Sequence, residues 1–395
     1  MSTDRDVVIL SMARTPFGRF GGALKEHSAI RLGAIAMAEA VHRSGVDPAD
    51  VQSVYAGIGM IGANVLTATR QALLLGSGLP ETVPSMGIDR ACCSGMTAIG
   101  MGYREIREGD IEVALCGGFE SLSNTPFLWP RQRGIRPGAV EVVDPLLLRA
   151  DFLDKAIARY TGEEAIRFGV DRGQQDDWAL QSHARYFAAD RDGYFEKERF
   201  PVETASGFVS ADESPRAEIR PEKLARLPTV YSSPTVTAGN APGLNDGAAF
   251  IVLATRRFAE SRGLAPLATI RGYVQVAGGP TTGSSTPAVA IQKVLAKTAT
   301  PLRDLARIEI NEAFAATPLV STLLLADQDL AAARALREKT NQAGGAVAIG
   351  HPLGASGARL VMTLANGLGR HGGGIGAAAI CGGFGQGDAV LLEVA

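Results

Sequence analysis

Hydrophobic and polar positions follow two alternating patterns along the first 120 residues. β-branched apolar runs, which are typical of buried strands, occupy residues 6–13, 51–56 and 111–116. Apolar positions at helical spacing lie between them, at residues 28–44, 63–75 and 94–108. Ser28 suits the N-cap of the first helix, and Gly109 suits the end of the last. Strands that alternate with helices predict an α/β domain with a largely parallel sheet.

The middle of the chain, about residues 119–245, differs in composition and lacks the regular alternation of strand and helix patterns. It holds both tryptophans, a Pro- and Arg-rich stretch at 129–138, and one helical pattern around 173–191. Alternation of strand and helix patterns resumes after about residue 265. We interpret the middle as an insertion that carries binding loops.

A short repeat links the two ends of the chain. Residues 114–119 read ALCGGF, and residues 379–384 read AICGGF. Each follows a helical pattern, and each helical pattern follows a small-residue turn that carries Cys92 or His351. Two matching turn–helix–strand units, one in each half, predict a duplicated fold.

Composition excludes several classes of protein. Lys and Arg total 39 against 41 Asp and Glu, so a broad nucleic-acid surface is not expected. No apolar run reaches the length of a membrane span, and the short polar N-terminus is not a signal peptide. Four cysteines in 395 residues do not form a disulfide framework. They favour a reducing, cytoplasmic setting in which single thiols can react.

Three residues are candidates for chemistry. Cys92 directly precedes a predicted helix, whose dipole is expected to lower the thiol pKa; a buried, inert cysteine is the alternative. His351 lies in the turn GHPLG, and Cys381 lies among glycines. Together they supply a nucleophile, a base and a second acid or base. Cys93 is expected to point into the core and Cys116 to pack there.

Other signals are weaker. The remaining histidines, His27, His42, His183 and His371, are expected to be solvent-exposed or capping residues. The chain contains no CxxC, HExxH or HxxxH spacing, so no metal site is predicted. Residues 57–62 read GIGMIG, which fits the dinucleotide fingerprint. They follow the second predicted strand, however, and a glycine-rich chain produces such matches by chance.

Seven motifs together resemble one family. They are ARTPFGRFGGALK (13–25), CCSG (92–95), GGFESLSNTP (117–126), TVTAGNAPGLNDGAA (235–249), NEAFA (311–315), GGAVAIGHPLGASGAR (344–359) and CGGFGQG (381–387). In this order and spacing the chain resembles a thiolase, of the acetyl-CoA acetyltransferase and 3-ketoacyl-CoA thiolase family, over essentially its whole length.

The resemblance implies an α/β thiolase fold with five α-β-α-β-α layers around two mixed five-stranded sheets. The N-terminal half is then 1–120 with 248–268, the inserted loop domain is 121–247, and the C-terminal half is 269–395. A homodimer or homotetramer is also implied. The expected activity is acyl-CoA acyl transfer by Claisen chemistry in fatty acid metabolism. Coenzyme A serves as co-substrate, and no cofactor is permanently bound.

The resemblance also implies residue roles. Cys92 matches the acylated nucleophile, His351 the base that takes its proton, and Cys381 the residue that moves the α-proton of the second acyl-CoA. Asn311 matches the residue that, with His351, forms one oxyanion hole. The backbone N–H groups of Cys92 and Gly383 match the second hole, where donors stabilise the charge that develops on the thioester oxygen.

Contacts to CoA and substrate are implied at six positions. They are Arg216, near the adenine, and Tyr160, Thr161, Ala238, Pro242 and Phe314. Several of these depart from the family pattern, since Tyr160-Thr161 replaces His-Met and Pro242 replaces a serine. Other departures are Asp89, Cys93 and Phe384.

Two rival functions remain. A decarboxylating ketoacyl synthase also has a Gly-His-x-Leu-Gly turn, but it needs His or Asn where Cys381 stands. A non-catalytic acyl-CoA-binding relative has no need of Cys92, Asn311, His351 and Cys381 together. Acyl chain length is not determined by the sequence. A groove for long acyl chains is a hypothesis, with possible lining residues Phe127, Trp129, Leu146, Leu147 and Leu148.

Overall fold

A computed structural model describes residues 5–61, 64, 66–129, 142–148, 150, 152–153 and 155–395. The strands are β1 (Val7–Arg14), β2 (Gly18–Arg19), β3 (Ser53–Gly57), β4 (Ser85–Ile88), β5 (Val113–Ser121), β6 (Val202–Thr204), β7 (Gly207–Val209), β8 (Asn245–Thr255), β9 (Ala268–Ala277), β10 (Leu305–Ile310), β11 (Gly374–Cys381) and β12 (Gln386–Val394). The helices are α1 (Ala29–Ser44), α2 (Ala68–Gly76), α3 (Ser94–Glu108), α4 (Ile157–Arg167), α5 (Arg172–Arg191), α6 (Pro221–Ala225), α7 (Arg256–Ser261), α8 (Thr286–Thr298), α9 (Ala316–Leu325), α10 (Leu330–Glu338), α11 (Ala346–Ile349) and α12 (Leu353–Arg370).

The order of the strands repeats itself about the centre of the main sheet. The order is β10-β11-β12-β9-β1-β8-β5-β3-β4. Read outward from the β9–β1 pair, β12 corresponds to β8, β11 to β5 and β10 to β3. The pairing agrees, because β3–β5 and β10–β11 are parallel while β5–β8 and β11–β12 are antiparallel. This symmetry supports the duplication that the ALCGGF and AICGGF repeat predicts.

The sheet differs in one respect from the expected pair of five-stranded sheets. Ten of the described strands form one sheet, because Val7–Ile9 of β1 pair antiparallel with Ala268–Ile270 of β9, and β6 and β7 form a separate two-stranded sheet. The C-terminal half contributes four strands to the ten-stranded sheet. The backbone edge of β1 that faces β9 is thereby hydrogen-bonded, which leaves fewer unpaired groups than two separate sheets would.

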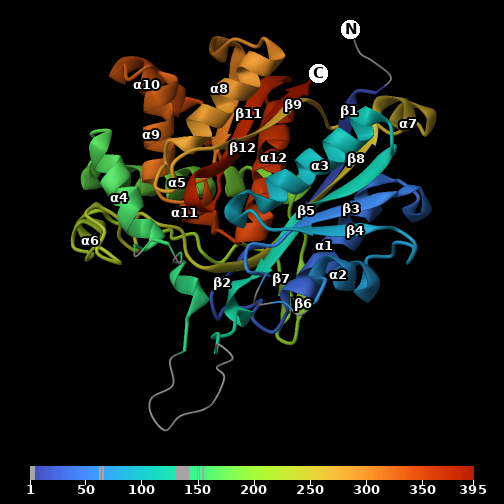
Figure 1. Ribbon diagram of the computed structural model, residues 1–395, viewed down its shortest axis with the longest axis horizontal. Coiled ribbons are helices and arrows are strands. Elements are labelled where there is room, and N and C mark those ends of the chain that lie inside the picture. The colour runs from blue at the N-terminus through green and yellow to red at the C-terminus, as the bar shows by residue number, and fades with distance from the viewer. Residues whose placement is uncertain are drawn as a thin grey trace.

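Five layers are nevertheless present. Helix α1 packs on β1, β5 and β8, and α8 packs on β9, β11 and β12 (Figure 1). Helices α3 and α12 lie against each other and contact strands of both halves. Two glycines permit this contact: a Cβ on Gly95 would lie 2.4 Å from the Gly354 carbonyl oxygen, and one on Gly357 would lie 2.3 Å from the Met96 nitrogen. The predicted α-β-α-β-α layering is confirmed.

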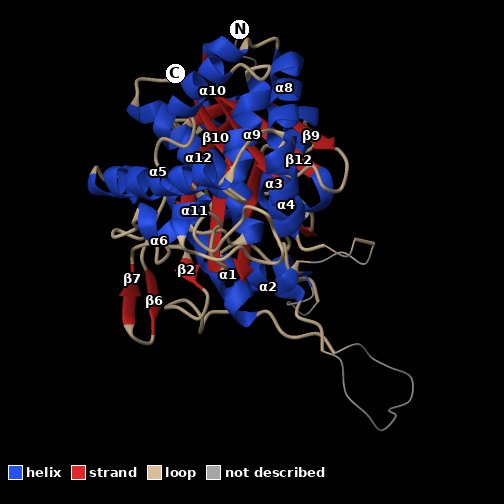
Figure 2. Cartoon of the chain, turned by 90° about the vertical axis from the view of Figure 1, so that its left-hand side faces the viewer, coloured by secondary structure: helices blue, strands red, loops and turns tan. Residues whose placement is uncertain are grey.

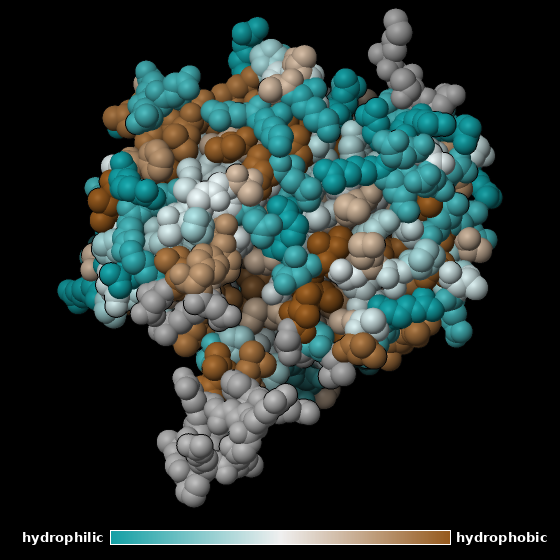
Figure 3. Space-filling model, in the orientation of Figure 1, coloured by the Kyte–Doolittle hydropathy of each residue, from teal (hydrophilic) through white to brown (hydrophobic). Residues whose placement is uncertain are grey.

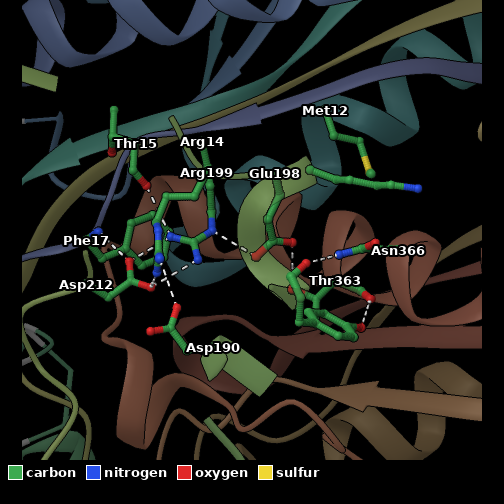
Figure 4. A network of polar contacts seen from close by, with 12 residues as sticks. Met12, Arg14, Thr15, Phe17, Asp190, Glu198, Arg199, Asp212, Thr363 and Asn366 are labelled. Atoms are coloured by element: carbon green, nitrogen blue, oxygen red, sulfur yellow. Dashed lines mark hydrogen bonds and ion pairs between the residues drawn. The ribbon is translucent and has the colours of Figure 1, made fainter. Parts of the chain in front are cut away.

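The region between β5 and β8 packs against the side of the sheet. It contains α4, α5, α6 and the β6–β7 hairpin (Figure 2). Buried Arg14 of β1 anchors it, with Nε 3.0 Å from Oε1 of Glu198 and Nη1 2.7 Å from Oδ1 of Asp212. Arg199 bonds to the other Asp212 oxygen at 3.1 Å (Figure 4). The domain boundaries 121 and 247 stay predictions.

Candidate active site

Two corresponding turns bring Cys92 and His351 together. Cys92 lies in a short 3-10 turn, Ala91–Cys93, that leads into α3, and His351 lies just before α12. Because α3 and α12 pack side by side, the starts of both helices meet. The Asp89 carboxylate accepts a hydrogen bond from the Ala91 N–H at 3.0 Å and so holds the first turn.

A chain of hydrogen bonds fixes the proton on the His351 ring. The Sγ of Cys92 lies 3.1 Å from Nε2 of His351. On the other side of the ring, Nδ1 lies 2.6 Å from the Ser356 hydroxyl, which donates its single proton to the Pro352 carbonyl at 2.8 Å. That hydroxyl can only accept from the ring, so Nδ1 carries the proton. Nε2 is therefore left as the acceptor that faces the Cys92 thiol.

Burial keeps both members of this pair neutral. Burial, together with the charge of Arg359, lowers the pKa of His351 to about 3. Burial raises the pKa of the Cys92 thiol above its usual range, and Cys381 adds to the rise. The expectation that the helix dipole lowers this pKa is wrong, because the loss of water around the thiol outweighs the helix terminus. The resting pair is a thiol hydrogen-bonded to a neutral imidazole.

The CGGFGQG loop approaches Cys92 from the other half of the chain. Cys381 is the last residue of β11 and is buried. Burial, with a contribution from Glu164, raises the pKa of its thiol to about 12. A Cβ added to Gly383 would lie 3.3 Å from the Cβ of Ala91, so the backbone there passes close to the Cys92 turn.

Asn311 directly follows β10 and is completely buried. Its Nδ2 lies 3.5 Å from Nε2 of His351, and its Oδ1 has no hydrogen-bond partner among the described residues. The neighbouring Glu312 carboxylate holds the loop. It accepts hydrogen bonds from Trp178, Ser182, Asn341 and the Val347 N–H, at 2.8 to 3.0 Å. A buried carboxylate with four donors is a rigid anchor.

Comparison with known proteins identifies the family. The model of the thiolase N-terminal domain matches residues 7–257, and that of the thiolase C-terminal domain matches residues 264–394. The chain belongs to the thiolase family. This finding confirms the resemblance, the fold and the class of enzyme that the motifs predicted, namely an acyl-CoA acyltransferase of the thiolase type.

Relatives of this thiolase match over nearly the whole chain. Acetyl-CoA acetyltransferase 2 of Arabidopsis thaliana is 38% identical over 402 residues and covers 99% of this chain and 97% of its own. The β-ketoadipyl-CoA thiolase of Pseudomonas aeruginosa is 38% identical over 406 residues, covering 98% and 99%. The human mitochondrial 3-ketoacyl-CoA thiolase, solved with CoA, is 34% identical, covers 100% and 99%, and has a TM-score of 0.93.

The predicted CoA and substrate residues of this thiolase fall into two groups. Tyr160 and Thr161 are buried in α4, and burial raises the pKa of the Tyr160 hydroxyl, with smaller contributions from the nearby Cys381 and Cys92 side chains. Arg216 and Ala238 are exposed, while Pro242 and Phe314 are partly buried. The second group is tied to the site indirectly, because the Ala315 N–H donates to the Asn240 carbonyl at 2.9 Å and so links the NEAFA and TAGN loops.

One histidine differs from the expectation. His183 was predicted to be exposed or capping, yet it is 2% exposed, and its Nδ1 accepts a hydrogen bond from the Arg216 N–H at 3.1 Å. Burial lowers its pKa to about 4. The helical pattern of α5 misled the prediction because its apolar stripe is weak and polar residues fill its inner face. His183 holds the loop that carries Arg216.

Sequence reasoning missed three residues that position the thiolase site. Ser356 sets the His351 tautomer, and the Asn245 side chain accepts from the His351 N–H at 2.9 Å. Glu120, buried, accepts from the N–H groups of Gly59 at 2.7 Å and Gly354 at 3.1 Å. All three lie within the motifs quoted above. A serine, an asparagine or a glutamate at such a position does not by itself indicate that the side chain positions a catalytic residue. The Gly59 bond also means that part of the dinucleotide-like GIGMIG is engaged by protein; Gly62 lies outside the described residues.

The described parts of the chain contain neither a metal-binding cluster nor a membrane-spanning helix. In the described parts of the chain, no group of three His, Cys, Asp or Glu side chains is arranged to hold a metal ion. Likewise, none of the helices that the structure describes combines the length and apolar character that crossing a membrane requires.

Proposed function

We propose that this thiolase makes or breaks a carbon–carbon bond of a 3-ketoacyl-CoA through an acyl-Cys92 intermediate. The contact between Cys92 Sγ and the unprotonated Nε2 of His351, at 3.1 Å, carries the proposal. It places a nucleophile beside a base whose other nitrogen is fixed by a third group, which is the general arrangement for nucleophilic catalysis. The presence of Cys381 supports this reading over a decarboxylating ketoacyl synthase.

In thiolysis, Cys92 Sγ attacks the 3-keto carbon while its proton passes to Nε2 of His351. The bond between the 2- and 3-carbons breaks, its electron pair leaves on acetyl-CoA as the enolate, and the Cys381 thiol donates the proton that completes acetyl-CoA. The Cys381 thiolate then takes the proton of free CoA. The CoA sulfur attacks acyl-Cys92, and the departing Cys92 recovers its proton from His351. Protons and electrons balance over the cycle.

Two sets of donors support the charges that develop. In this proposal, Asn311 and His351 stabilise one oxyanion, His351 once its Nε2 has taken the Cys92 proton, and the N–H groups of Cys92 and Gly383 stabilise the other. Donors fixed in advance in a buried site stabilise an oxyanion more than water does. The reverse direction joins the acetyl group on Cys92 to the enolate of a second acetyl-CoA.

The finer parts of the proposal rest on the family and the composition. The relatives include an acetyl-CoA acetyltransferase, a β-ketoadipyl-CoA thiolase and a 3-ketoacyl-CoA thiolase. The substrates in these names differ in the acyl group, which is therefore the part of the substrate that the family leaves unspecified. We further propose that CoA is the co-substrate and that the enzyme has no resident cofactor. We also propose that it is a homodimer or homotetramer, that it lies in the cytoplasm and that it acts in fatty acid metabolism. The six CoA and substrate contacts, including Arg216 and Tyr160, belong to it as well.

Acylation of Cys92 is the direct test. Incubation with acetyl-CoA is expected to add the mass of one acetyl group to the intact protein, and peptide mapping is expected to place it on Cys92. Free CoA is expected to remove the adduct. A folded protein that forms no adduct with any acyl-CoA would make this chain a non-catalytic acyl-CoA-binding relative.

The pH dependence of acylation follows from the His351 pKa. A base with a pKa of about 3 is already proton-free at all pH values above that, so it stays competent as the pH falls from 8 to 5. An ordinary histidine, with a pKa of about 6.5, would lose activity across that interval. We expect a flat initial rate of adduct formation between pH 5 and 8. An inflection near 6.5 would contradict the burial argument.

A further inference from the structure

Phe384 has a backbone conformation that is unusual for its residue type. It lies in the loop after Cys381 with φ 59° and ψ 51°, in the left-handed region that favours glycine. Its neighbours Gly382, Gly383 and Gly385 are all glycine. A bulky side chain in this conformation persists only where the surroundings hold it, and such positions concentrate at functional sites. The conformation of Phe384 therefore indicates that contacts of its ring hold this side chain in place.

The Phe384 ring is held by a second aromatic ring. Phe152 meets it edge-to-face, with 5.4 Å between the ring centroids and 65° between the planes. Phe152 itself is 68% exposed and comes from the segment before α4, far away in sequence. Two aromatic rings from different parts of the chain thus form a wall beside Gly383.

Phe384 lines a cavity of about 740 Å³, and Phe152 braces its ring without being among the lining residues. Ala91, the neighbour of Cys92, and Gly383, two residues after Cys381, also line it, so the cavity lies next to the reaction centre. Its apolar lining includes Leu128, Val143, Leu147, Leu148, Ile157 and Phe384. Apolar side chains also border the hollow near the centre of the face in Figure 3. Of the five residues expected to line an acyl groove, Leu147 and Leu148 do so; Phe127, Trp129 and Leu146 are not among its lining.

The charged groups described in this lining are engaged by the protein. Arg90 bonds to Asp388 and to Gln386. The carboxylates of Asp89 and Asp144 accept from backbone N–H groups at 3.0 and 2.9 Å. Among the residues that the structure describes here, the larger part of the surface left for a ligand is apolar, and the cation Arg90 is already paired. The cavity therefore suits a hydrocarbon chain better than a chain that ends in a carboxylate.

We propose that Phe384, braced by Phe152, forms one wall of an acyl pocket, and that this pocket makes the enzyme select 3-ketoacyl-CoA with an unbranched apolar chain longer than acetoacetyl. The proposal rests on the function proposed above and specifies its substrate.

A series of substrates tests the selection. Thiolysis is measured with acetoacetyl-CoA, 3-ketohexanoyl-CoA, 3-ketooctanoyl-CoA and an ω-carboxylated 3-ketoacyl-CoA of similar length. Because each buried methylene contributes up to roughly fourfold, kcat/KM is expected to rise at least about tenfold from acetoacetyl-CoA to 3-ketooctanoyl-CoA. A flat or falling profile, or a preference for the carboxylated substrate, would overturn the proposal.

Two variants tie the selection to the wall. In Phe384→Gly and, separately, in Phe152→Ala, the ratio of kcat/KM for 3-ketooctanoyl-CoA to that for acetoacetyl-CoA is expected to fall about tenfold. Phe152→Ala leaves the sequence of the Gly383 loop unchanged and so keeps the test decisive if Phe384→Gly folds poorly. Phe208→Ala is the matched control, since Phe208 is 71% exposed on β7, outside the cavity; its ratio should equal that of the wild type.

The failure of this inference is distinguishable from that of the proposed function. If acetyl-CoA acylates Cys92 but the ratio is unchanged in both wall variants, the acyl pocket is overturned and the thiolase chemistry stands. If no acyl-CoA acylates the wild type, both fail together.

Discussion

Replacement of Cys92 by alanine is expected to lower turnover by at least about ten thousandfold, because loss of the nucleophile from a covalent mechanism leaves only binding and the oxyanion donors. In the described structure Cys92 is the thiol within hydrogen-bond distance of the His351 base. The variant should also show no acetyl adduct. Turnover is measured by thiolysis of acetoacetyl-CoA, and the adduct by intact mass after incubation with acetyl-CoA.

The adjacent cysteine provides the matched control. Cys93 is fully buried, with its Sγ 3.6 Å from the Ile380 carbonyl oxygen and packed against Gly382. Cys93→Ala therefore removes core packing and costs roughly 1 kcal/mol of stability, while turnover is expected to stay within about threefold of the wild type. Thermal unfolding of both variants checks their folding. Equal losses of activity in Cys92→Ala and Cys93→Ala would mean that damage to the Ala91–Cys93 turn, and not removal of the Cys92 thiol, causes the loss.

Much of the scaffold could be predicted from local patterns. The helix predicted at 94–108 is α3 with the same bounds, and the one predicted at 28–44 is α1, with Ser28 as its N-cap. Cys93 and Cys116 are buried as expected. These features depend on residues near in sequence, such as a capping hydroxyl or a helical apolar stripe, and local physics decides them.

What could not be predicted depends on contacts between distant parts of the chain. The pairing of Val7–Ile9 with Ala268–Ile270 has no local signature, and it turned two expected sheets into one. The pKa of Cys92 depends on burial that α12 and the Cys381 loop complete, so a helix terminus alone gave the wrong direction. Ser356 acts only because the turn folds its hydroxyl onto the His351 ring.

Replacement of Cys381 by alanine is expected to separate the two halves of the reaction. Carbon–carbon bond cleavage should slow by about a thousandfold, since a positioned general acid or base contributes 10²–10⁴-fold. Burial keeps the Cys381 thiol protonated, with a pKa of about 12, so it is the group in a state to donate a proton to the departing enolate. In acylation by acetyl-CoA, His351 activates Cys92, and Cys381 only returns a proton to the departing CoA. A CoA thiolate can leave without that proton, so the acetyl adduct should still form, though more slowly. The measurements are acetoacetyl-CoA thiolysis and adduct formation in the same preparation.

The duplicated fold offers the control for this variant. Cys116 of β5 corresponds to Cys381 of β11 in the ALCGGF and AICGGF repeat, and both are buried. Cys116 packs against Gly102 of α3, where an added Cβ would lie 2.4 Å from its Sγ, so Cys116→Ala alters the core alone. It should keep thiolysis while losing some stability. If Cys381→Ala also kept thiolysis, another group would have to deliver the proton; if it lost the adduct as well, Cys381 would act on Cys92 itself. Only the loss of thiolysis with the adduct retained assigns the proton of the carbon–carbon step to the second half of the fold, and the nucleophile to the first.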